Sequence, residues 1–62
     1  MRQILAELDH RDDGTFTVAR LTDENTNDIT YLVEPGQRFA ATAELEALLA
    51  GELGGPVTVE ED

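Results

Sequence analysis

The sequence contains no cysteine, no serine, no lysine and no tryptophan. Without cysteine, neither a disulfide framework nor thiolate ligation of a metal is available to the chain. Without serine, cysteine and lysine, the acyl-enzyme, thiolate and Schiff-base chemistries of those side chains are excluded. The lack of disulfides is consistent with a cytoplasmic protein, which is the location that we expect.

Long apolar runs are absent as well. A helix that spans a membrane needs about 20 predominantly apolar residues in succession, and no stretch of this sequence approaches that length. The N-terminal segment MRQILAEL reaches Glu7 and Asp9 before an apolar core of secretory length develops, so we expect a native N-terminus without a signal peptide. A chain of 62 residues allows one small domain with a modest core.

Positive charge is scarce. Fourteen Asp and Glu residues face four Arg, and the formal net charge is −10. Binding to nucleic acid through its phosphates requires a basic surface, and anionic membranes repel an acidic protein in the same way. We therefore expect no direct nucleic-acid binding and no membrane binding, but attraction of basic partners and weak, unspecific binding of cations.

Several explanations of this acidity remain open at this point. The acidic, Lys-free composition is similar to that of proteins from halophilic archaea, whose surfaces stay hydrated in molar salt while the salt screens self-repulsion. The alternatives are the ordinary acidity of a small bacterial or phage protein and a surface of carboxylates that binds a partner. The resemblance is one of bulk composition, so it transfers no functional residue.

Alternation of polar and apolar residues predicts a β-hairpin in the first third of the chain. The two strands cover residues 3–9 and 15–21, and Asp13-Gly14 between them is a strong turn dipeptide. The apolar residues expected on the inner face are Ile4, Ala6, Leu8, Phe16 and Val18.

The middle of the chain predicts a loop, a third strand and a turn. Residues 22–28 contain no apolar side chain and are rich in turn formers. Residues 29–33 alternate again, and Pro35-Gly36 suits the centre of a type II turn. The chain then continues extended, with Phe39 expected to pack under the start of a helix.

The stretch TAELEALLAGELGG, residues 42–55, predicts the only helix. Its leucines recur at helical spacing and form one stripe, Leu45, Leu48, Leu49 and Leu53. We expect Thr42 as the N-cap, and the Gly-Gly-Pro sequence at 54–56 ends the helix. Residues 57–59 alternate as a short final strand.

The predicted fold is therefore α+β. It is a small two-layer domain in which an antiparallel three- to four-stranded sheet is packed by one helix, in the order β-β-β-α-β. The domain covers residues 1–59, and residues 60–62 are expected to form an acidic disordered tail. The sequence leaves the neighbour of the last strand open.

The sheet face away from the helix is the first candidate for an interaction surface. If the predicted registers hold, Leu5, Leu21 and Leu32 point there together with Ala19. We therefore expect a small non-enzymatic interaction or regulatory protein that acts through its sheet face or edge, as a homodimer or with another protein.

Six carboxylates in and beside the predicted loops form the second candidate surface: Asp9, Asp12, Asp13, Asp23, Glu24 and Asp28. Carboxylates held in place of phosphates would make the protein an acidic nucleic-acid mimic that inhibits a DNA- or RNA-binding protein. Three arginines, Arg11, Arg20 and Arg38, interrupt this negative field.

Candidates for catalysis and metal binding are weak. His10 lies beside acidic residues in the predicted hairpin loop, where we expect a solvated side chain and no general base. A group at Asp23, Asn25, Asn27 and Glu34 matches four ligand positions of an EF-hand loop, but Gly is missing at the sharp turn and strands are expected to flank it. We predict no catalytic residue, no cofactor and no metal site.

Overall fold

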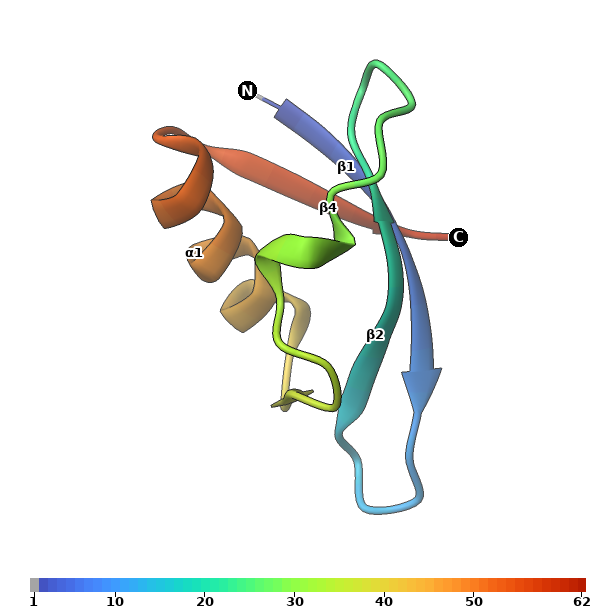
Figure 1. Cartoon of the computed structure of the whole chain (residues 1–62). Coiled ribbons are helices and arrows are strands. Elements are labelled where there is room, and N and C mark those ends of the chain that lie inside the picture. Colours follow the sequence, from blue (N-terminus) through green and yellow to red (C-terminus); the bar gives the residue numbers. More distant parts are fainter. Residues whose placement is uncertain (1) are drawn as a thin grey trace.

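The computed structural model describes residues 2–62, so residue 1 of the domain predicted at 1–59 lies outside the described part. The elements, in chain order, are β1 (Arg2–His10), β2 (Phe16–Thr22), the 3₁₀ helix η1 (Thr30–Leu32), β3 (Arg38–Phe39), α1 (Thr42–Leu53) and β4 (Val57–Glu61). In Figure 1, α1 and η1 lie on the same side of the long β1–β2 hairpin. No helix in the described residues is long and apolar enough to cross a membrane.

The four strands form one mixed sheet in the order β3-β2-β1-β4. β2 pairs antiparallel with both β1 and β3, whereas β4 pairs parallel with β1. Because β2 is antiparallel to both of its neighbours, β3 runs parallel to β1. Helix α1 connects β3 to β4, and β4 runs in the same direction as β3 and β1. The prediction of a small α+β fold with one helix is confirmed, and the prediction of a purely antiparallel sheet is wrong.

The predicted hairpin of the first two strands is confirmed. In its turn, Arg11 N–H donates to the carbonyl of Thr15 at 2.8 Å, and Gly14 N–H donates to the carbonyl of Arg11 at 3.2 Å. Gly14 has a φ of 87°, which side chains with a Cβ rarely adopt. The turn therefore lies where the Asp13-Gly14 dipeptide predicts it, but Asp12 and Asp13 are its central residues and Gly14 follows them with positive φ.

A β-bulge in β2 changes which side chains reach the core. Glu7 of β1 pairs with Arg20, but the next residue of β1 pairs with Val18, so Ala19 has no partner. One extra residue reverses the alternation of side chains beyond it. Leu21 is therefore buried, at 0% exposure, and its predicted place on the outer face is wrong.

The core joins the sheet, η1 and α1. Its buried residues are Ile4, Ala6, Phe16, Leu21, Ile29, Val33, Phe39, Leu45 and Leu49. The leucine stripe of α1 faces this core as predicted, with Leu48 and Leu53 partly buried beside it. Phe39 is the predicted anchor, and its ring stacks on Phe16 with the centroids 5.7 Å apart.

The predicted third strand at residues 29–33 is wrong, because this segment forms η1. Asp28 Oδ1 accepts hydrogen bonds from the backbone N–H and the hydroxyl of Thr30, at 2.9 and 2.5 Å. Such an Asx turn bends the backbone where an extended strand would begin. Tyr31 is consequently 80% exposed, while Ile29 and Val33 on either side of η1 are buried.

The turn after η1 and both ends of α1 test three further predictions. The turn at Pro35-Gly36 is confirmed, with Gln37 N–H donating to the carbonyl of Glu34 at 3.1 Å. Gly54 ends α1 in the left-handed conformation, as predicted. The N-cap is Ala41 and makes no side-chain cap hydrogen bond, so the prediction of Thr42 as the N-cap is wrong by one residue.

The C-terminal residues belong to the sheet. β4 runs to Glu61, and Asp62 N–H donates to the carbonyl of Ala6 at 2.7 Å. Two residues of the predicted tail, Glu60 and Glu61, are thus the last residues of β4 and pair in parallel with Leu5 and Ala6. On the other side of β4, the carboxylate of Glu46 from α1 accepts the N–H of Val59 at 2.8 Å and occupies part of the open edge.

The bulge makes a prediction for stability. We expect Leu21→Ala to lower the free energy of unfolding by about 2–5 kcal/mol, because it empties a fully buried site. We expect Leu5→Ala, on the outer face, to lower it by less than about 1 kcal/mol. Urea unfolding followed by circular dichroism measures both. Equal effects of the two substitutions would contradict the bulged register.

Candidate functional site

The three leucines predicted to form one contact surface lie in different environments. Leu5 is on the outer face of β1 and is 45% exposed. Leu21 is in the core, and Leu32 is partly buried against it from η1. Of the three, only Leu5 therefore lies on the outer face, and within residues 2–62 no apolar surface joins them.

The rest of the outer face is polar because the bulge keeps polar residues of β2 opposite those of β1. In the register, Leu5 pairs with Thr22, Glu7 with Arg20 and Asp9 with Thr17. Water therefore covers this face at little cost in free energy.

An apolar groove lies instead between β2 and the segment from η1 to the following turn. Its volume is about 420 Å³. The lining residues are Val18, Ala19, Thr30, Tyr31, Val33, Glu34, Pro35 and Gly36. We call it the Tyr31 groove. Tyr31 is the most exposed of the large apolar residues in the described part of the chain.

Local hydrogen bonds hold the two walls of the groove in place. The Thr30 hydroxyl accepts the N–H of Leu21 at 2.9 Å, and Ile29 N–H donates to the carbonyl of Leu21 at 2.9 Å. These bonds fix the start of η1 against the end of β2. At the other end of β2, β3 pairs only with Phe16 and Thr17. The middle of β2, at Val18 and Ala19, therefore faces the groove.

This groove could not be predicted from the sequence because residues 29–33 fit two periodicities. Strand alternation groups Ile29 with Tyr31 and Val33, whereas a helical turn groups Ile29 with Leu32 and Val33. The signal that favours the turn is Asp28 followed two residues later by Thr30, a spacing that suits an Asx turn. The helical grouping matches the burial that the structure shows.

The six carboxylates of the predicted acidic surface fall into two groups at opposite ends of the hairpin (Figure 1). Asp9, Asp12 and Asp13 are near the turn that joins β1 and β2, and the other three are in the loop that follows β2. They therefore do not form one continuous patch.

Three of these carboxylates are held by the backbone beside them. Asp13 Oδ1 accepts the hydroxyl and the N–H of Thr15, at 2.6 and 3.0 Å, and these bonds lower the pKa of Asp13. The hydroxyl and N–H of Thr30 lower the pKa of Asp28 in the same way. A carboxylate that accepts such bonds is stabilised in its charged form.

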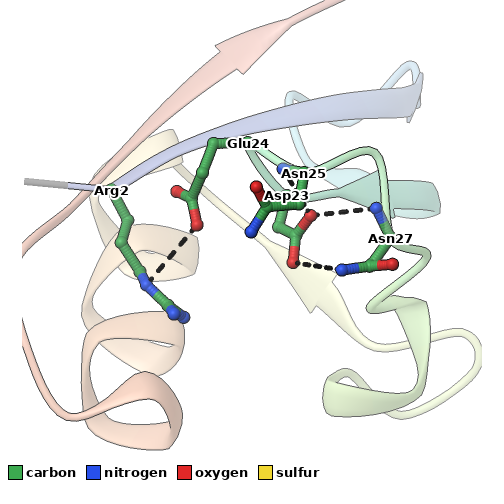
Figure 2. A network of polar contacts seen from close by, with 5 residues as sticks. All are labelled: Arg2, Asp23, Glu24, Asn25 and Asn27. Atoms are coloured by element: carbon green, nitrogen blue, oxygen red, sulfur yellow. Dashed lines mark hydrogen bonds and ion pairs between the residues drawn. The ribbon is translucent and has the colours of Figure 1, made fainter.

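Figure 2 shows the third carboxylate, Asp23, inside its loop. Its Oδ1 accepts the N–H of Asn27 and the N–H of Asn25, both at 2.9 Å, and its Oδ2 accepts the side-chain amide of Asn27 at 3.4 Å. Backbone donation from Asn27 lowers the pKa of Asp23 most. Next to it, Glu24 lies 3.7 Å from Nε of Arg2.

This geometry is unlike that of an EF-hand loop. Residues 23–34 follow strand β2 and include the 3₁₀ helix η1, whereas an EF-hand loop lies between two α-helices. Among the described residues, no group of three or more Asp, Glu, His or Cys side chains is arranged to hold a metal ion.

His10 ends β1 and has a partner from the far end of the chain. Its Nε2 lies 2.6 Å from Oε2 of Glu61, and its ring centroid is 5.8 Å from that of Phe16. The side chain is exposed, as expected, but it is paired. This contact links the ends of β1 and β4.

No protein-family model, no curated protein and no solved structure matches the chain.

The carboxylates predict a dependence of stability on pH. The folded pKa of Asp28 is lowered, so its charge stabilises the fold above the unfolded pKa, and this contribution is lost as pH falls through the folded pKa. We expect Asp28→Asn to lower the melting temperature relative to Asp12→Asn above about pH 5, with the difference vanishing toward about pH 2. Both variants remove one negative charge, and the carboxylate of Asp12 has no hydrogen bond or ion pair within the described residues. If the difference in melting temperature between the two variants did not change with pH, the stabilisation could not be assigned to the charged form of Asp28.

The balance of charge predicts a dependence on salt. Only three of the fourteen carboxylates, those of Asp13, Glu24 and Glu61, have an ion-pair partner in the described residues, so eleven have none. We expect potassium chloride between about 0.05 and 1 M to raise the melting temperature by at least about 5 °C, because it screens this repulsion. A further rise of the melting temperature above about 1 M potassium chloride would favour the interpretation that the acidity is an adaptation to high salt. A melting temperature that does not change with salt would show that repulsion among the carboxylates does not limit the stability of the fold.

Proposed function

We propose that the protein is a cytoplasmic, non-enzymatic binding module that holds a partner protein in the Tyr31 groove. The observation that carries this proposal is the 80% exposure of Tyr31 at the side of an open apolar groove. Tyrosine is enriched among the residues that dominate binding energy, because its ring supplies apolar area and its hydroxyl a hydrogen bond. The hydrogen bonds of Ile29 and Thr30 to Leu21 hold the segment that carries Tyr31 against β2.

The composition supports a binding role over a catalytic one. The chain has no serine, cysteine or lysine nucleophile, and its single histidine is paired with Glu61 outside the groove. The titratable residues that line the groove are Tyr31 and Glu34. Neither adjoins a group that would activate it as a nucleophile in the described structure.

The charge favours a basic partner over a second copy of the same chain. Two copies would each bring a formal charge of −10 to their interface, whereas a basic protein is attracted before contact. A homodimer in which each copy covers the groove of the other is the alternative within the same class of function.

The nucleic-acid mimic is the alternative from another class. Its support is the fixation of Asp13, Asp23 and Asp28 by hydrogen bonds, which gives three carboxylates defined positions. A basic partner would then contact the ends of the hairpin and would not need Tyr31.

The proposal is tested by selecting random linear peptides from a display library on the immobilised protein at about 0.15 M salt. We expect the selected peptides to bind Tyr31→Ala at least about tenfold more weakly than the unchanged protein. Leu5→Ala is the matched control, because it truncates the exposed leucine of the outer face. We expect it to bind the same peptides with unchanged affinity.

Other outcomes would overturn the proposal in distinguishable ways. Loss of binding in Leu5→Ala alone would assign recognition to the sheet face. Peptides that bind both variants equally, and are released by high salt, would favour the nucleic-acid mimic. Sedimentation of the unchanged protein as a dimer that Tyr31→Ala dissociates would show that a second copy occupies the groove.

A further inference from the structure

The Tyr31 groove has one charged lining residue, and that residue has no partner inside the chain. Glu34 makes no ion pair or side-chain hydrogen bond within the described residues. Two arginines are engaged elsewhere, Arg2 with Glu24 and Arg38 with Asp13. The groove therefore presents a negative charge that no ion pair within the described residues neutralises.

The walls supply apolar contacts around that charge. Val18 and Ala19 face the groove from β2, and Val33 and Pro35 line it from the segment after η1. The exposed ring of Tyr31 adds a surface over which a cation can lie, since the face of an aromatic ring attracts positive charge. One groove thus combines an apolar floor, an aromatic face and a carboxylate.

The shape favours side chains of a polypeptide over an added strand. Pairing with β3 occupies Phe16 and Thr17, and hydrogen bonds to Ile29 and Thr30 occupy Leu21. Only the short middle of β2 lies between these points, which is too little for the ladder that strand addition uses. On the other edge of the sheet, Glu46 occupies the N–H of Val59.

Building on the proposed function, we propose that the groove recognises a partner segment that carries an aliphatic residue and, close to it in sequence, Arg or Lys. The aliphatic side chain lies between Val18, Val33 and Pro35. The cation lies beside the carboxylate of Glu34 and against the ring of Tyr31. The net charge of −10 draws such a segment toward the molecule, and the groove supplies the specificity.

The test uses three synthetic peptides and two protein variants. The peptides are acetyl-Gly-Gly-Leu-Arg-Gly-Gly-amide and its versions with Leu replaced by Ala or with Arg replaced by Gln. Binding is measured by titration of ¹H–¹⁵N amide shifts, and shifts are expected at Ala19, Tyr31 and Gly36. The Leu-to-Ala peptide is expected to bind at least about threefold more weakly, because less apolar surface is buried.

The charge is tested by Glu34→Gln against Glu52→Gln, an exposed carboxylate on α1 outside the groove. Both variants have the same net charge. We expect Glu34→Gln to weaken binding of the Arg peptide by about two- to fivefold relative to Glu52→Gln. The Gln peptide should bind the two variants equally, since it has no cation to lose.

The outcomes separate this inference from the proposed function. Groove shifts with equal affinity for Glu34→Gln and Glu52→Gln would overturn recognition of the cation and leave the groove as a binding site. Shifts confined to the hairpin ends, or no shifts with any peptide, would overturn the inference. In that case the dependence of display-selected peptides on Tyr31 decides the proposed function independently.

Discussion

The extra residue at Ala19 determines how the two faces of the sheet are used. Because it interrupts the pairing of β1 with β2, Leu21 turns into the core and Arg20 and Thr22 turn outward. The core that includes Leu45 and Leu49 of the helix gains a fully buried residue, and the outer face loses an apolar side chain that a face-to-face contact would need. β-bulges commonly redirect side chains in this way. Fold and surface therefore depend on the same irregularity.

The bulge also decides where an interaction surface can form. Beyond it, the end of β2 is held by Ile29 and Thr30 from the segment around η1, and at its start β2 is held by β3. The groove opens between these two attachments, and Tyr31 projects beside it. The proposed binding role rests on this arrangement, with the acidity of the chain setting the sign of the partner's charge.

Much of the fold could be predicted from local patterns. The leucine spacing of residues 42–55 and the Asp13-Gly14 turn each gave one structure with little competition, and both are confirmed. Residues 29–33 fitted a strand and a helical turn equally, and the hydrogen bonds of Asp28 to Thr30 favour the turn. The groove was missed because it depends on that choice. Of the predicted site residues, Leu5 lies on the outer face as expected and Leu21 does not.

The sequence by itself determined the properties that depend on composition or on neighbours along the chain. These are the charge, the absence of thiol and amine nucleophiles, the helix and the first hairpin. The tertiary structure alone decided the register of β2, the parallel place of β4 and the exposure of Tyr31. The physical reason is that register and strand order minimise the apolar area left in water over the whole core, and that sum includes residues far apart in sequence.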